Sequence, residues 1–560
     1  MSVIGVILKR KIFSKIAFGC FLLTVPLSVR KVLFIFSPDG SGLFNEYTDI
    51  SLYLSDLTLL LFLLAIVLEN KERILSIKKL QSLFHVEQSN FPILAPLPFL
   101  CWAGLSILWS ESRMLGFFAL FKLLEGYFLY VAMIISLVPR GTNDALSAEC
   151  STWNNEKTKI FSNNLFHVEQ IKMSTDGIFN KLKIVPRGTM RNFLIWIKEN
   201  CSTWNIWGIL FYLVIFIGVS QGILAITQFI FQSSIGINFL RESIFSASQP
   251  GIAKIIIGEG VFVRSYGLFP HPNILAVFLG ISILFTISAP LIFSRNLFHV
   301  EQLLIAYRTA LFIQGFGFLV TFSKSAFFGF LMAIFYYIFR LFHVEQPKNK
   351  VKDLVIVPRG TITHTKNYFY SYCSTWNNKN FMQIFRLNLF HVEQRKNLFL
   401  IGLLFFLSVL FFSSVNWHYF FFQPLEERNF ISQEFLSIIS QNTIGGVGIG
   451  QSVLLMQNYF NEKLLSWQFQ PIHSLFLLIL IETGVVGFGL WILFFMMLAR
   501  ILFRKNVPRG TQKERAVTTL IVSMSLFMAI VSFFDHYFWD IQQGQLLLWL
   551  LFGVVASKMK

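Results

Sequence analysis

Long apolar stretches alternate with shorter polar connections along most of the chain. Twelve of these stretches have about the twenty residues with which an α-helix crosses a hydrocarbon core of about 30 Å. Lipid offers no partners to unpaired backbone groups, so we expect each stretch to be helical. The predicted spans are 13–35, 51–68, 91–109, 114–137, 206–231, 267–293, 303–322, 325–340, 397–416, 472–500, 516–534 and 543–557.

The overall composition excludes most soluble architectures. The 560 residues are 54% hydrophobic and 14% charged, whereas soluble domains average about 25% charged residues. A soluble chain of this length would also divide into several domains joined by polar linkers. We therefore predict an all-α polytopic integral membrane protein in which residues 1–560 form one membrane domain of twelve transmembrane helices.

Basic residues divide unequally between alternate connections. The set that includes both termini holds 36 Lys and Arg, and the opposite set holds 7. Basic loops stay cytoplasmic, so both termini are predicted to be cytoplasmic, in the plasma (inner) membrane. The net charge of +18 is then an orientation signal, and no nucleic-acid partner is needed to explain it. The segment 417–471, between the ninth and tenth spans, becomes a large extracytoplasmic loop.

Three short strings recur in the connections. Leu-Phe-His-Val-Glu-Gln begins at 83, 165, 297, 341 and 389; Val-Pro-Arg-Gly-Thr at 138, 185, 357 and 507; Cys-Ser-Thr-Trp-Asn at 150, 201 and 373. All three are translations, in three reading frames, of one palindrome, TGTTCCACGTGGAACA. Copies beginning at 341, 357, 373 and 389 stand 16 residues apart, and the frame changes at each step. We interpret the strings as a DNA element inserted into the gene.

The inserted strings remove several misleading signals. They account for five of the ten His and three of the five Cys, so neither a metal site nor a disulfide framework is predicted. All twelve copies fall in connections predicted to be cytoplasmic, where insertions disturb little. We therefore expect polar, poorly ordered loops at 138–205 and 340–396, and the working face on the opposite side of the membrane.

Two cations stand out among the few charges of the opposite face. Arg264 precedes the sixth span, which begins near Pro272 and Asn273. Proline suits the first turn of a helix, where exposed amides favour an anion, and arginine can hold a phosphate bidentately. Lys324, the only charge in the turn 321–326, is a second candidate for phosphate. The alternative for both cations is simple anchoring at the membrane interface.

The large outer loop contributes a histidine. The loop contains Gly445–Gly450, which permits tight turns but lacks the Lys and Ser/Thr of a nucleotide-binding P-loop. His473 follows where the chain re-enters the bilayer, and Glu482 lies deeper in the same span. A histidine with a pKa near about 6.5 can accept a proton from a sugar hydroxyl at neutral pH, although a structural role is the alternative.

Other charged residues have less specific interpretations. Arg30 lies toward the outer end of the first span and is a weaker candidate cation. Lys122 and Glu125 are spaced to pair within the fourth span, which indicates structural neutralisation. His536 stands in the last outer turn with Asp535, Trp539 and Asp540. That turn either lines a polar opening or forms an aromatic and acidic interface belt.

Three stretches together resemble the O-antigen ligase and polymerase superfamily of bacterial envelope glycosyltransferases. They are Arg264–Ala276, Thr321–Ala326 and Gly445–Gly489, and the resemblance covers about residues 206–560. The resemblance implies a GT-C-like ligase fold that needs no metal or cofactor. It also implies transfer of a glycan from undecaprenyl-pyrophosphate to a hydroxyl of a glycan, lipid or protein acceptor.

The resemblance also implies roles for individual residues. His473 would deprotonate the acceptor hydroxyl, and Arg264 and Lys324 would stabilise the departing pyrophosphate, so we expect these three residues to lie close together. Arg30 would be a third cation, with Glu482, Asn273 and His536 in support. The chain departs from the family in two places: Lys324 replaces an Arg, and Ser474 replaces the Asn that commonly follows the loop His.

A polysaccharide or lipid-linked glycan transporter, or flippase, is the alternative from another functional class. Twelve spans with both termini inside also suit a transporter. Against that interpretation, the two halves of the chain show no convincing similarity, and the polar candidates gather at one face of the membrane instead of at its midplane. The sequence does not separate ligase, polymerase and protein-glycosylating activities.

Overall fold

The computed structural model describes residues 12–70, 91–137, 206–292, 301–343, 435–503 and 512–559, apart from residues 43, 250, 436, 461 and 462. Helices dominate this part of the chain. They are α2 (Ile12–Thr24), α3 (Leu54–Glu69), α6 (Phe91–Leu94), α7 (Leu97–Leu105), α8 (Arg113–Leu137), α11 (Ile206–Phe231), α12 (Pro272–Ile292), α13 (Glu301–Leu319), α14 (Lys324–His343), α18 (Met456–Tyr459), α19 (Leu475–Phe503), α20 (Gln512–Ser532), α21 (Tyr537–Asp540) and α22 (Gln542–Ala556). Short 3-10 turns occupy Ser106–Trp109, Asn238–Leu240, Ser466–Gln468 and Ser557–Met559.

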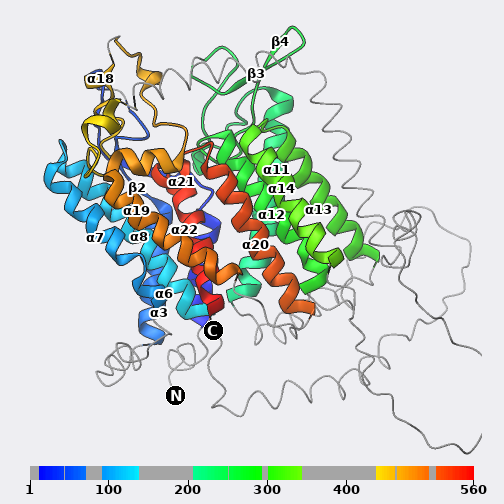
Figure 1. The fold of residues 1–560 in the computed structure, drawn as a ribbon. Helices are drawn as coiled ribbons and strands as arrows, with labels where there is room; N and C mark the ends of the chain where they lie inside the picture. The colour runs from blue at the N-terminus through cyan, green and yellow to red at the C-terminus, as the bar shows by residue number, and fades with distance from the viewer. Residues whose placement is uncertain are drawn as a thin grey trace, which may run out of the picture.

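The long helices pack side by side in one bundle (Figure 1). Among the described residues, six helical segments are long and apolar enough to cross a membrane. They are Pro92–Trp109, Arg113–Leu137, Ile206–Phe231, Pro272–Ile292, Leu475–Phe503 and Lys513–Ser532. Two shorter apolar helices, α2 and α22, accompany them. The described structure is therefore that of a mostly helical, multi-pass membrane protein.

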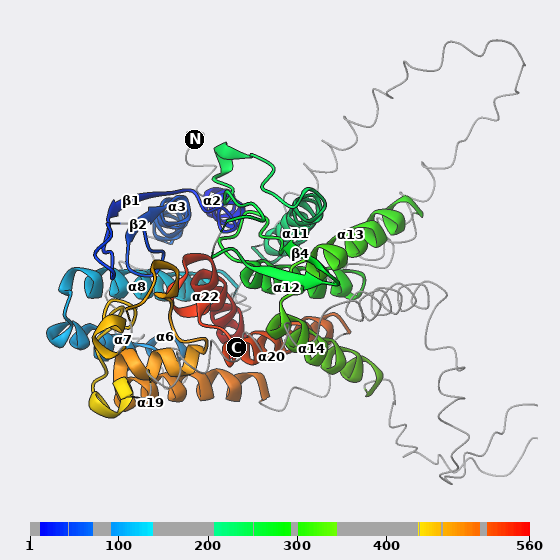
Figure 2. The same cartoon turned by 90° about the horizontal axis from the view of Figure 1, so that it is seen from above.

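Seen from above, α22 lies between two groups of helices (Figure 2). One group contains α3, α7, α8 and α19, and the other contains α11, α12, α13 and α14. Helix α22 packs against α8, α19 and α20, and every one of its residues is buried. Its apolar side chains are therefore covered by protein, whereas α19 exposes much of its apolar surface. The core of the molecule runs along α22 and α12.

Most predicted spans coincide with helices, but the first does not continue as far as expected. Helix α2 ends at Thr24, before Pro26, whose missing amide hydrogen cannot continue a helix. The rest of the predicted span 13–35 contains strand β1 (Arg30–Phe34), which pairs antiparallel with β2 (Ile50–Tyr53). Apolar runs this short do not distinguish strand from helix, which is why the sequence misled here.

A second hairpin also departs from the all-α expectation. Strands β3 (Lys254–Ile257) and β4 (Gly260–Val263) pair antiparallel just before the segment that enters α12. Helix α12 begins at Pro272, as its ring geometry favours. The hairpin, α18 and α21 lie at one end of the bundle, and α22 finishes near the other (Figure 1). Candidate site residues are concentrated at the end that carries the hairpin.

Several predictions fall outside the described residues. The ninth span, 397–416, and the loop 138–205 are among them, and only the beginnings or ends of 340–396 and 417–471 are described. Most copies of the inserted strings also lie outside. Two copies of Leu-Phe-His-Val-Glu-Gln overlap described helices, because α13 begins at Glu301 and α14 ends at His343.

Helix α19 is interrupted at Gly484. Its φ of 66° and ψ of −174° form a backbone conformation that glycine adopts far more readily than other residues. The amide of Val447 donates to the carbonyl of Ile481 at 2.9 Å, and that of Gly448 donates to the carbonyl of Glu482 at 3.0 Å. A loop that precedes α19 in sequence thus satisfies carbonyl groups at the break.

Candidate functional site

The turn between α20 and α22 joins the elements that carry the candidate residues. Asp535 in this turn is buried, and its carboxylate accepts hydrogen bonds from two other elements. The Asn273 amide at the start of α12 donates to it at 3.0 Å, and the Ser325 hydroxyl at the start of α14 also donates to it. Its backbone carbonyl accepts the amide of Leu475, the first residue of α19, at 3.2 Å. Asp535 therefore fixes three helix beginnings relative to one another.

Arg264 belongs to this arrangement. It directly follows β4 and is half-buried. Its Nε donates to the carbonyl of Thr321 at 2.7 Å, and its Nη2 donates to Oδ1 of Asn273 at 2.5 Å. Asn273 thus stands between the guanidinium and the Asp535 carboxylate. We refer to Arg264, Asn273, Ser325 and Asp535 as the Asp535 cluster.

Lys324 is the first residue of α14 and directly precedes a member of the Asp535 cluster, Ser325. The turn before it is strained, because Phe322 has a φ of 50°, in the left-handed region that few non-glycine residues adopt. The Phe322 side chain is buried against Ile255 and Phe229, and this packing holds the turn in place. Strain of this kind occurs preferentially at functional sites. The turn places a half-buried lysine beside the cluster.

His473 lies on the other side of the same turn. Its ring centroid is 5.2 Å from that of His536, the residue after Asp535. His536 is buried, and its Nδ1 lies 2.8 Å from the carboxylate of Asp540. Nδ1 can donate to that carboxylate when it carries a proton, which fixes the orientation of the imidazole. His473 is half-buried and therefore more accessible than His536.

The contacts of Asp535 and His536 reach residues next to or bonded to the three that we expected to lie together, Arg264, Lys324 and His473. Asp535 bonds to the residue that holds Arg264 and to the neighbour of Lys324, while His536 contacts His473. Two consecutive residues of one turn thus contact His473, the residue bonded to Arg264 and the residue that follows Lys324. Asn273 and His536, the expected supporting residues, are the groups that make the links.

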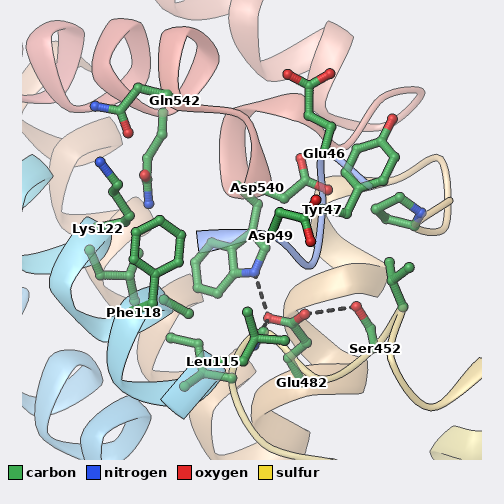
Figure 3. Close-up of a pocket in the computed structure, with 18 of the residues that line it drawn as sticks. Glu46, Tyr47, Asp49, Leu115, Phe118, Lys122, Ser452, Glu482, Asp540 and Gln542 are labelled. Atoms are coloured by element: carbon green, nitrogen blue, oxygen red, sulfur yellow. Dashed lines mark hydrogen bonds between the residues drawn. The ribbon is translucent and has the colours of Figure 1, made fainter. Parts of the chain in front are cut away.

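Glu482 is also connected to this turn, as a fully bonded carboxylate. It is buried and accepts three hydrogen bonds. The Gly450 amide donates at 2.9 Å, the Ser452 hydroxyl at 2.7 Å and the Trp539 indole at 2.8 Å; the last two are drawn in Figure 3. Three donors on one carboxylate indicate that Glu482 positions other groups: it ties α19 to the glycine loop, residues 445–450, and to the turn that carries His536.

The glycine loop has a structural explanation. A Cβ on Gly446 would lie 2.5 Å from the backbone of Glu482, and one on Gly448 would lie 2.1 Å from the hydroxyl of Ser110. Both glycines also have positive φ. The glycines therefore allow close packing of backbone against the interrupted helix α19, and this packing brings Gly450 within reach of the Glu482 carboxylate.

Arg30 does not join the Asp535 cluster. It lies on β1, and its guanidinium forms an ion pair with Glu46 at 2.7 Å and a hydrogen bond to the hydroxyl of Tyr53 at 2.8 Å. It also lies over the ring of Phe44, at 4.5 Å from the centroid. These contacts all belong to the segment 44–53. The expectation that Arg30 serves as a third phosphate-binding cation therefore has no support in its surroundings, because its charge is paired with a carboxylate.

Next to His536 the structure contains a pocket that the sequence did not predict. The pocket has a cavity volume of about 80 Å³ and is partly open to solvent. Lys122 and Gln542 face it from one side and Glu46 and Tyr47 from the other (Figure 3). Its charged and amide lining includes Glu46, Asp49, Lys122, Glu482, Asp540 and Gln545. These residues come from segments far apart in sequence, so no local motif could have indicated the pocket.

The phenol of Tyr47 connects the pocket to the imidazoles. Its ring meets that of His536 edge-on at 5.5 Å between centroids. Burial raises the pKa of Tyr47 well above its ordinary value, and the nearby carboxylates of Asp540 and Glu46 raise this pKa further. The phenol therefore stays protonated at neutral pH and keeps a hydrogen available for donation.

Two of the residues that line the pocket, Lys122 and Gln542, belong to a group of buried polar side chains. We call this group the Lys122 cluster: Asp56, Lys122, Glu125 and Gln542. The ammonium group of Lys122 is 2.6 Å from Asp56 and 3.3 Å from Glu125. The Gln542 amide donates to Asp56 at 2.6 Å. The Lys122–Glu125 pair was predicted from spacing, but Asp56, on a different helix, was not. Each of these side chains is buried, so the cluster joins α3, α8 and α22 from within.

No protein-family model matches the chain, and no curated protein or solved structure matches it significantly. The function must therefore be inferred from the site itself.

Proposed function

We propose that the protein is a membrane glycosyltransferase of the O-antigen ligase or polymerase type. It would move a glycan from undecaprenyl-pyrophosphate to an acceptor hydroxyl on the outer face of the plasma membrane. One observation carries this proposal: Asp535 bonds to Asn273, which holds Arg264, and to Ser325, which follows Lys324. The next residue, His536, contacts His473. A diphosphate leaving group and a hydroxyl nucleophile need cations and a base in one place.

The proposed reaction is a single displacement. His473 accepts the proton of the acceptor hydroxyl as its oxygen attacks the anomeric carbon of the donor glycan. A new glycosidic C–O bond forms, the C–O bond to the diphosphate breaks, and the configuration at that carbon inverts. The diphosphate leaves with the bonding electrons, and its added negative charge is stabilised by Arg264 and Lys324. His536, held by Asp540, positions the ring of His473.

The surroundings of Arg264 favour this use of its charge. Two of its guanidinium nitrogens are held by the neutral oxygens of Thr321 and Asn273. These bonds orient the guanidinium plane, and an oriented guanidinium suits bidentate binding of a phosphate. The polyprenyl tail would remain among the apolar helices, which explains why the reaction requires a membrane scaffold.

The test is transfer by the purified protein in lipid nanodiscs, with an undecaprenyl-pyrophosphate-linked glycan as donor. Mass spectrometry would identify the glycosylated acceptor. We expect His473→Ala to abolish transfer while the protein still inserts and folds. His343→Ala is the matched control, because His343 ends α14, the helix that Lys324 begins. Normal transfer by His473→Ala would contradict the proposal.

A transporter or flippase is the second candidate, and two observations favour it. Helix α19 is interrupted at Gly484, and interrupted helices often form binding sites in transporters. The Lys122 cluster also places ionisable groups inside the helix bundle, a frequent feature of transport pathways. A flippase would move a fluorescent lipid-linked glycan across a proteoliposome membrane without any acceptor. Translocation of the lipid-linked glycan without transfer would favour this candidate.

A further inference from the structure

We propose that the pocket beside His536 binds a sugar ring that carries no anionic group. If the proposed function is correct, this ring also carries the acceptor hydroxyl. The first statement concerns binding alone, and only the second rests on the proposed function. Four observations support sugar binding in this pocket. They are the composition of the pocket wall, the charge of the wall, the amide of Gln545 and the position of the pocket beside the imidazoles.

The wall of the pocket combines the two kinds of group that a sugar ring requires. The aromatic side chains of Tyr47, Phe118 and Trp539 line it and can cover the apolar faces of a pyranose. Carboxylates and amides lie among them and can accept or donate hydrogen bonds to hydroxyl groups. Apolar walls with a few convergent polar groups are typical of small-molecule sites.

Gln545 points most directly to a ligand. It lines the pocket from α22 and is 5% exposed. Most other polar groups of the wall are bonded within the protein, for example Glu482 to Ser452 and Trp539. The side-chain amide of Gln545, in contrast, has no hydrogen-bond partner within the described part of the chain. The amide is not fully enclosed, so it faces the open space of the pocket, where a hydroxyl-bearing ligand would supply both a donor and an acceptor.

The charge of the pocket determines which sugars can enter. Four carboxylates line it, from Glu46, Asp49, Glu482 and Asp540, against the single ammonium group of Lys122. That ammonium group is already shared between Asp56 and Glu125, and Arg30 offsets only Glu46. A uronic acid or a sugar phosphate would therefore meet net repulsion. A neutral sugar would not, and an amino sugar would be attracted.

The position of the pocket connects this specificity to the reaction. Tyr47 and Asp540 line the pocket, and both contact His536. Pro471, two residues before His473, also lines it. The carboxylates of the pocket therefore lie close to His536, the residue that directly follows the Asp535 carboxylate in sequence. The negative donor and an uncharged acceptor would each meet surroundings of suitable charge.

The experiment compares three methyl glycosides of one ring: glucoside, glucosaminide and glucuronide. Binding to the purified full-length protein in nanodiscs would be measured by saturation-transfer NMR and by Trp fluorescence. We expect the glucoside and the glucosaminide to bind, and the glucuronide to bind about tenfold to a hundredfold more weakly. Equal or tighter binding of the glucuronide, or no binding of any glycoside, would overturn the proposal.

Two variants locate the binding. Gln545→Leu removes the amide at similar volume and should weaken glucoside binding about tenfold. Gln543→Leu is the matched control, since this buried amide on the same helix donates to the carbonyl of Leu27 and does not line the pocket. Glu46→Gln should bring glucuronide binding closer to that of the glucoside. Unchanged binding in Gln545→Leu would show that the sugar binds elsewhere, which also overturns the proposal.

The outcomes separate this inference from the proposed function. Selective binding of uncharged glycosides without any transfer from a lipid-linked donor would support sugar binding in the pocket and contradict the proposed transferase function. Transfer that uses uronic-acid and neutral acceptors equally would support the transferase and reject the pocket. His473→Ala should abolish transfer yet keep glucoside binding, because His473 does not line the pocket.

Discussion

The Lys122 cluster and the Asp535 cluster use charge in opposite ways. In the Lys122 cluster, an ammonium group meets carboxylates directly, and all of these charged side chains are buried. In the Asp535 cluster, the neutral amide of Asn273 lies between guanidinium and carboxylate, and Arg264 is half-buried. Charges that satisfy one another within the bundle hold helices together. A charge held by neutral groups near an accessible surface remains able to attract a ligand.

The largest effect on stability should follow from breaking the Lys122 cluster. Lys122→Met leaves Asp56 and Glu125 buried without their cation, which typically costs about 3–5 kcal/mol. We expect a much lower midpoint of thermal unfolding in nanodiscs. Adding Asp56→Asn and Glu125→Gln to Lys122→Met should recover most of the loss, because no unpaired charge then remains. Arg113→Met, at the exposed start of the same helix, is the control and should change little.

If Lys122→Met unfolds at the same temperature as the wild type, the cluster does not hold the helices together. An ion-transport role would then become the better interpretation of these charges.

Arg264→Gln should separate activity from stability. It removes the charge but keeps a polar side chain, so the free energy of unfolding should fall by about 1 kcal/mol or less. Transfer should fall by about 10²–10³-fold if Arg264 stabilises the leaving diphosphate. Transfer by Arg264→Lys should lie between that of the wild type and that of Arg264→Gln, because lysine keeps the charge but lacks the planar guanidinium. Arg241→Gln, in the same connection, is the control.

A loss of transfer in Arg264→Gln no greater than in Arg241→Gln would contradict the role of Arg264. Loss of folding in Arg264→Gln would instead show that the two clusters do not differ in the way described.

Asn273→Asp would convert the Asp535 cluster into one resembling the Lys122 cluster. The new carboxylate would bond directly to Arg264 and would face Asp535 across a contact that is 3.0 Å in the native protein. Neutralising the guanidinium in this way should raise KM for the lipid-linked donor about tenfold. Asn238→Asp adds the same charge to the same connection, outside the cluster. An unchanged KM in Asn273→Asp would mean that the charge of Arg264 does not bind the donor.

The smallest effect is expected at Asp39, where a carboxylate has only neutral donors. Hydrogen bonds from Ser37, Ser41 and Ser466 lower the pKa of Asp39 below its ordinary value. The stabilisation is therefore present above the ordinary aspartate pKa of about 3.9 and is lost as the pH falls through the lower pKa of the folded state. Hydrogen exchange of residues 466–468 should rise at acid pH in the wild type. Asp39→Asn should show no such dependence, and an identical pH profile would contradict the assignment.

Much of the helical framework could be predicted from length and apolarity. The predicted span 206–231 coincides with α11, and Pro272 begins α12. These features depend on local sequence and on the demand that backbone groups in lipid be paired. The strand β1 could not be predicted in this way, because its apolar residues suit either a strand or the end of a helix. Only its partner β2 distinguishes the two.

The residues of the candidate site also differ in whether local sequence was enough to predict them. His473, Arg264 and Lys324 could be selected because charges are rare on that face and because three short motifs resemble one family. The pairing of Arg30 with Glu46 and the pocket could not, since both depend on contacts between separate segments. Glu482 was selected as a supporting residue, but its three donors come from the glycine loop and the last turn. Only the folded backbone brings these donors together.

Two described helices also include residues of the recurring strings. Helix α13 begins at Glu301, within one Leu-Phe-His-Val-Glu-Gln copy, and α14 ends at His343, within another. This string contains neither Pro nor Gly, the two poorest helix formers. If the strings are an inserted DNA element, codons of foreign origin therefore supply part of two helices.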